Sequence, residues 1–95
     1  MLRYAMALRD TNPDDHQTTA LQALVWTLAE PSRAARLLDT TGLEPTELKA
    51  RAGEPAVLAA TLMFLEAHEP DLIACADELG VAPARLVAAR ERLEA

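Results

Sequence analysis

The sequence holds one cysteine, three glycines and three aromatic residues, and each shortage excludes a class of structure. A single cysteine, Cys75, cannot form an internal disulfide and fits a reducing compartment. Because Tyr4, Trp26 and Phe64 are the only aromatic residues, the core must be mainly aliphatic. Runs of β-branched residues are also missing, whereas Ala and Leu are abundant, and this composition predicts an all-helical protein.

Long apolar runs and an excess of positive charge are missing as well. Residues 1–10 include two arginines but no apolar run long enough for a signal peptide. The longest apolar stretch, residues 56–65, is far shorter than a membrane span. Nine basic residues against fifteen acidic ones give a formal charge of −6, which repels nucleic acid and acidic membranes at long range. We therefore expect a soluble, cytoplasmic protein that does not bind membranes. Nucleic acid is an unfavourable partner for it.

One pattern occurs twice in the sequence. It consists of a helix, a proline, a second helix, a glycine turn, a second proline and a third helix. Residues 24–52 align with residues 62–93 at an offset of about 38 residues, which places Gly42 opposite Gly80. The repeat predicts an all-α fold, a compact bundle of five to six short helices, built as a degenerate internal duplication with three helices in each half. Two units are too few for an open solenoid, so a closed bundle is favoured. The sequence leaves open how the two halves pack.

The pattern predicts a single helical domain over residues 14–95, preceded by an N-terminal arm at residues 1–13 that is either flexible or a short helix. The segment 56–65 is apolar on every side, which is typical of a central, buried helix. In the first helix of the domain, four aliphatic residues recur at the spacing of one helix face and are predicted to pack into the core. They are Leu21, Leu24, Val25 and Leu28.

Residues 76–93 resemble the helix-turn-helix of bacterial repressors, in which the second helix enters the major groove. The side chains that would read guanine edges or phosphates are Arg85, Arg90 and Arg92. Residues 83–95, however, hold three arginines and two glutamates, and DNA affinity depends mainly on phosphate neutralisation. The same turn recurs at Gly42, where acidic residues flank the second helix. This recurrence favours a structural role for the turn over DNA binding. A DNA-binding regulator is therefore the alternative interpretation.

Motifs for catalysis, cofactors or metals are not evident in the sequence. Residues 66–71 gather three acids and a histidine, but without the spacing that is diagnostic of a metal site. Cys75 lies among aliphatic residues, as buried, inert cysteines do. No phosphate-binding glycine loop or nucleophile elbow is present. We therefore predict a non-enzymatic protein with no cofactor and no metal.

The remaining class is a protein–protein interaction module, which binds an unknown protein partner or a second copy of itself. Trp26 is the only large aromatic residue capable of anchoring an interface, and tryptophan is enriched at binding hot spots. Its correspondence with Phe64 in the second half favours a core position instead. In the N-terminal arm, Tyr4 and Met6 belong to an apolar segment that could dock on a partner.

Two runs of residues carry a resemblance to a known family: Thr41-Gly42-Leu43-Glu44-Pro45 and Arg51-Ala52-Gly53-Glu54-Pro55. With the apolar helix that follows, they resemble a family of small all-helical alphaproteobacterial proteins that is classified only as a domain of unknown function. The likeness covers about residues 15–95. It implies a compact all-α fold in a bacterial, cytoplasmic protein, and it supplies no activity, cofactor or site residue.

Overall fold

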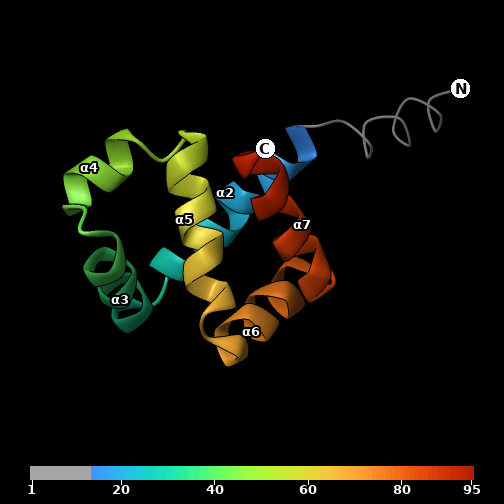
Figure 1. The fold of residues 1–95 in the computed structure, drawn as a ribbon. Coiled ribbons are helices and arrows are strands. Elements are labelled where there is room, and N and C mark those ends of the chain that lie inside the picture. Colours follow the sequence, from blue (N-terminus) through green and yellow to red (C-terminus); the bar gives the residue numbers. More distant parts are fainter. Residues whose placement is uncertain (1–13) are drawn as a thin grey trace, which may run out of the picture.

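The computed structural model describes residues 14–95, and within them it contains six helices and no strand (Figure 1). The helices are α2 (Asp14–Leu28), α3 (Pro31–Thr41), α4 (Pro45–Ala50), α5 (Pro55–Glu66), α6 (Glu69–Leu79) and α7 (Pro83–Glu94). The predicted all-α fold and the number of helices are confirmed. The predicted N-terminal arm, residues 1–13, lies outside the described residues.

Prolines and glycines set most of the helix boundaries. Each helix from α3 to α7 has a proline in its first two positions, where the missing amide hydrogen costs nothing. α3 and α6 end at Gly42 and Gly80, whose φ angles of 73° and 71° are left-handed. The Gly42 amide donates to the Leu38 carbonyl over 2.8 Å, and the Val81 amide donates to the Ala76 carbonyl over 3.0 Å. These bonds satisfy carbonyls that would otherwise be unpaired at the helix ends.

Helix α5 is the centre of the bundle, as its apolar sequence predicts. It packs against α2, α3, α6 and α7 (Figure 1). Seven of its twelve residues are buried, and the side of the helix that they leave open carries Ala56, Ala60 and Met63. The only polar one, Thr61, donates its hydroxyl to the Val57 carbonyl over 3.0 Å and so satisfies its hydrogen bond inside the core. Met63 is the exception, with 53% of its surface exposed.

The prediction for the inner face of α2 is wrong. Leu24 is buried, but Leu21, Val25 and Leu28 face outward. The other buried positions of α2 are smaller: Thr19, Ala20, Ala23 and Thr27. Small side chains allow α2 to approach α5 and α7 closely, and the Thr27 hydroxyl avoids a burial penalty by donating to the Ala23 carbonyl over 2.8 Å.

Corresponding helices of the two halves differ in length and position. α7 has twelve residues and packs against α2, α5 and α6, whereas α4 has six residues and buries only Leu48. Figure 1 shows α4 at one edge of the bundle and α7 on the opposite side, next to α2. Trp26 and Phe64 also differ, because Phe64 is buried and Trp26 only partly so. The internal duplication therefore stays a prediction from sequence.

Replacement of Gly42 or Gly80 by alanine is expected to lower the free energy of unfolding by about 1–2 kcal/mol each, because a Cβ atom disfavours left-handed φ angles. An added Cβ would meet no atom within 4 Å at either position, so the cost is one of backbone conformation. Gly53→Ala is the matched control, since Gly53 has similar free space and no left-handed φ. Urea denaturation of the three variants measures the difference. Equal stability of all three would contradict the role of the two glycines as helix ends.

Candidate functional site

Three large aliphatic side chains lie uncovered along one side of α2. The exposed fractions are 36% for Leu21, 67% for Val25 and 40% for Leu28. Their spacing of four and then three residues places them on one helix face. Trp26 lies at the flank of this face and is partly buried. We call these four residues the α2 apolar surface.

Two grooves run along the α2 apolar surface, and Leu21 and Val25 line both. The first, the α2–α6 groove, has a volume of about 480 Å³ and reaches Glu78 and Leu79 at the end of α6. The second, the α2–α4 groove, has a volume of about 460 Å³, and its far wall comes from α3 and α4. The two exposed side chains therefore form a ridge between two apolar grooves.

The short length of α4 leaves the second groove open. In the C-terminal half, the twelve-residue α7 packs against α5 and α6 and covers their apolar sides. α4, by contrast, has only six residues, and they include Pro45, Leu48 and Lys49 on the groove wall. Leu38 of α3 and Leu28 of α2 line the same groove. A longer α4 would cover this surface, which is instead exposed to solvent.

Trp26 is held in place by Arg33 of α3. The Arg33 guanidinium carbon lies 3.7 Å from the centroid of the Trp26 ring, and Arg33 Nη2 donates to the Trp26 carbonyl over 2.7 Å. A cation over an aromatic face contributes about 0.5–2 kcal/mol, depending on solvent access. The contact covers one face of the indole, while another part of Trp26 lines the α2–α6 groove. Trp26 therefore belongs both to the edge of the core and to the uncovered surface.

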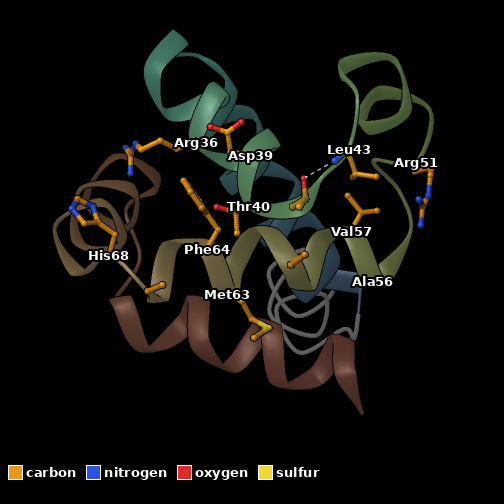
Figure 2. Close-up of a pocket in the computed structure, with 13 residues that line it drawn as sticks. Arg36, Asp39, Thr40, Leu43, Arg51, Ala56, Val57, Met63, Phe64 and His68 are labelled. Atoms are coloured by element: carbon orange, nitrogen blue, oxygen red, sulfur yellow. Dashed lines mark hydrogen bonds between the residues drawn. The ribbon is translucent and has the colours of Figure 1, made fainter.

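A third groove, of about 790 Å³, lies between α3 and α5 (Figure 2). Its apolar lining includes Val57, Met63 and Phe64 of α5, and Figure 2 shows Arg36 and His68 at one end and Arg51 at the other. A hydroxyl in its wall, that of Thr41, already donates to the Leu37 carbonyl over 2.9 Å. We call this the α3–α5 groove.

The basic side chains at the ends of the α3–α5 groove have acidic partners within the chain. Arg36 Nη2 and His68 Nδ1 both lie 3.0 Å from Asp71 Oδ2, and Arg51 Nε lies 3.0 Å from Glu54 Oε1. Partial burial raises the pKa of Asp71, but the hydrogen bonds from Arg36 and His68 outweigh it and bring the pKa below its usual value. Asp71 is therefore ionised and engaged near neutral pH.

The corner between α6 and α7 does not present its three arginines equally. Arg85 and Arg92 are exposed, but only 20% of the Arg90 side chain is. Arg90 Nε lies 2.5 Å from Glu66 Oε2, and Arg90 Nη1 lies 2.7 Å from Glu94 Oε1. The hydrogen bond to Glu66 is the main reason that the pKa of Arg90 is raised. Arg90 thus joins α7 to α5, and its charge is neutralised where DNA would need it.

The other residues singled out in the sequence give no catalytic or metal-binding arrangement in the described part of the chain. Among residues 14–95, no three His, Cys, Asp or Glu side chains are grouped so that they could hold a metal ion. Cys75 is buried in α6, and this burial raises the pKa of its thiol to about 11. Tyr4 and Met6 lie outside the described residues. Over residues 14–95, no helix combines the length and apolarity needed to cross a membrane.

The sequence predicts the wrong inner face for α2 because its large aliphatic residues recur at the spacing of one helix face. Ala20, Ala23 and Thr27 also recur at the spacing of one helix face. A stripe of small residues can pack as closely as a stripe of large ones. The signal was therefore present, but the sequence did not say which of the two stripes would be covered.

Comparison with known proteins identifies a family and no activity. A family model described as a protein of unknown function (DUF3572) matches residues 13–95. This agrees with the resemblance drawn from the glycine and proline corners, while an alphaproteobacterial origin stays a prediction. No curated protein and no solved structure matches the chain.

The thiol of Cys75 is expected to react with an alkylating reagent at least about 100-fold more slowly in the native protein than in the urea-unfolded chain at pH 8. Burial excludes the reagent, and the raised pKa of about 11 leaves little thiolate at this pH. Mass spectrometry of timed samples measures the two rates. Equal rates would mean that α6 does not bury Cys75, which would contradict its core position.

Proposed function

This chain belongs to the DUF3572 family of proteins of unknown function, and we propose that it is a non-enzymatic protein–protein interaction module. The contact is the α2 apolar surface, with the two grooves beside it. The partner is another protein or a second copy of the chain. The observation that carries the proposal is the exposure of Leu21, Val25 and Leu28 on one face of a well-formed helix.

Exposure of these side chains has an energetic consequence. Complete burial of one Val or Leu side chain stabilises a complex by about 1.5–3 kcal/mol relative to leaving it in water. Contiguous apolar patches, unlike single exposed residues, mark interaction sites. Anchors at a spacing of four and three residues match the way in which helices dock into grooves. The neighbouring Trp26 adds a residue type that is enriched at binding hot spots.

The charge pairing elsewhere supports the choice of this surface over the α3–α5 groove. Arg36, His68 and Arg51 at the ends of that groove already have acidic partners within the chain. A ligand or partner there would compete with these pairs. On the α2 apolar surface, by contrast, the exposed anchor side chains are aliphatic, so a partner would displace only water.

A double variant, Val25→Gln with Leu28→Gln, is expected to reduce partner capture by the tagged chain more than about tenfold. Burial of a glutamine without hydrogen-bond partners costs about 1–3 kcal/mol, and 1.4 kcal/mol corresponds to tenfold in affinity. Both positions are exposed and glutamine is a good helix former, so the fold should be kept. Quantitative mass spectrometry of co-purified proteins gives the partner readout, and light scattering reports self-association.

The matched control is Met63→Gln with Ile73→Gln, which also replaces two exposed apolar residues, 53% and 47% exposed, by glutamine. A protein that the wild type and the control capture equally, and that the test variant loses, supports the proposal. Equal capture by both variants would contradict the assignment to α2. A wild-type chain that is monomeric and captures nothing above background would contradict the interaction module itself.

The alternative, a helix-turn-helix-like DNA-binding regulator that uses residues 76–93, takes second place. It is supported by the Gly80 corner and by the exposure of Arg85 and Arg92, and it is weakened by the pairing of Arg90 with Glu66. The net charge of −6 opposes phosphate binding.

We expect a random DNA duplex to leave the solution mass of the protein unchanged at low and at moderate salt. Light scattering makes this measurement directly. A mass increase at low salt that disappears in Arg85→Ala with Arg92→Ala would instead favour DNA binding through α7. The matched control would be Arg51→Ala, which removes one partly exposed cation between α4 and α5.

A further inference from the structure

We infer that a second copy of the chain covers the α2 apolar surface. The two copies form a two-fold symmetric dimer in which the α2 helices run parallel and Lys49 of each copy contacts Glu78 of the other. The inference rests on the proposed function, because it names the partner of the same surface. Three features of residues 14–95 carry it: a neutral helix face, a ridge beside grooves that can receive it, and one charge of each sign on the groove walls.

The exposed side of α2 is neutral. Residues 17–29 contain no acidic or basic side chain, whereas residues 14–95 as a whole hold fourteen acidic and seven basic residues. Like charges that lie opposite each other weaken an interface, so an acidic chain is best suited to meet a second copy through a face with few charges. The α2 apolar surface meets its own copy without bringing acidic side chains together.

The α2 apolar surface also has a shape that complements itself. Leu21 and Val25 form a ridge, and the α2–α4 groove beside it has a volume of about 460 Å³ and apolar walls that include Leu28 and Leu38. Helical surfaces pack when the ridge of one enters the groove of the other. A two-fold axis parallel to α2 places the ridge of each copy in the α2–α4 groove of the other, so one symmetric contact fills both grooves.

The walls of the two grooves carry opposite charges. Lys49 of α4 lines the α2–α4 groove, and Glu78 of α6 lines the α2–α6 groove on the other side of Leu21 and Val25. Both residues are exposed, and among the described residues neither takes part in an ion pair. The neutral ridge therefore has one available cation on one side and one available anion on the other.

Symmetry decides which of these charges meet. A two-fold axis parallel to α2 exchanges the two sides of the helix, so the α4 side of one copy lies against the α6 side of the other. Lys49 then faces Glu78 of the other copy, and the dimer contains this pair twice. An axis across α2, in the plane of the contact, would make the helices antiparallel and would place each charge on the same side as its own copy. Charge complementarity selects the parallel arrangement.

Reversal of either charge tests this arrangement. Lys49→Glu places two acids opposite each other, and Glu78→Lys places two bases there. Each variant is expected to raise the dissociation constant of the dimer about tenfold, because it converts two attractive pairs into two repulsive ones. The double variant, Lys49→Glu with Glu78→Lys, restores both pairs with reversed polarity and is expected to lie within about threefold of the wild type. Sedimentation equilibrium at protein concentrations up to about 1 mM measures these constants.

An effect of net charge alone would give a different result. Lys49→Glu makes the chain more acidic and would weaken any dimer, whereas Glu78→Lys makes it less acidic and would strengthen one. The matched control is Glu91→Lys, which makes the same change in charge at an exposed position of α7 that lines neither groove. We expect this control to leave the dimer at least as stable as that of the wild type. Circular dichroism confirms that each variant is folded.

Two results would overturn the inference. A wild-type chain that stays monomeric up to about 1 mM does not form the dimer. A dimer that Glu78→Lys leaves unchanged or strengthens does not join Glu78 to Lys49 of the other copy.

Failure of this inference is separable from failure of the proposed function. A monomeric wild type that captures another protein, and that loses it in Val25→Gln with Leu28→Gln, would overturn this inference alone. A dimer that Val25→Gln with Leu28→Gln leaves intact would overturn the assignment to α2, and both proposals would fall with it.

Discussion

The close packing of α2 against α5 and α7 is the contact on which the rest of the structure depends. Ala20 and Ala23 are completely buried in it, and their small side chains bring the helix backbones near each other. Because one side of α2 is used for this contact, its larger residues lie on the opposite side, where α3, α4 and α6 leave Leu21, Val25 and Leu28 exposed. The same packing therefore stabilises the bundle and leaves the surface that we propose for binding.

The lengths of α4 and α7 determine how much of the neighbouring helices each of them covers. α7 has the twelve residues needed to lie across α2, α5 and α6, and the ion pair between Arg90 and Glu66 fixes it to α5. α4 has six, too few to extend over the same area of α2 and α3. The apolar surface exposed in the N-terminal half thus follows from one short helix, without any distortion of the fold. The described residues thus combine a closely packed core with an exposed apolar face on α2.

The distribution of charge has a similar effect on function. Four of the seven Lys and Arg side chains in residues 14–95 are engaged within the chain: Arg33 with Trp26, Arg36 with Asp71, Arg51 with Glu54 and Arg90 with Glu66. These contacts join helices or close turns, so they hold the bundle together. The described residues carry an excess of acidic side chains, which opposes contact with phosphate groups.

The sequence by itself determined the helix boundaries, because prolines and glycines act through the local backbone: Pro55 begins α5, and Gly80 ends α6. It also determined the central place of α5, since a helix that is apolar on all sides has nowhere else to go. Only the tertiary structure decided which side of α2 is inside. The small residues (Ala20, Ala23 and Thr27) and the large ones (Leu21, Val25 and Leu28) both recur at helical spacing. Which of the two sets is buried depends on how closely the neighbouring helices can approach. The pairing of Arg90 with Glu66, 24 residues apart, was equally invisible, because it arises only when α5 and α7 meet.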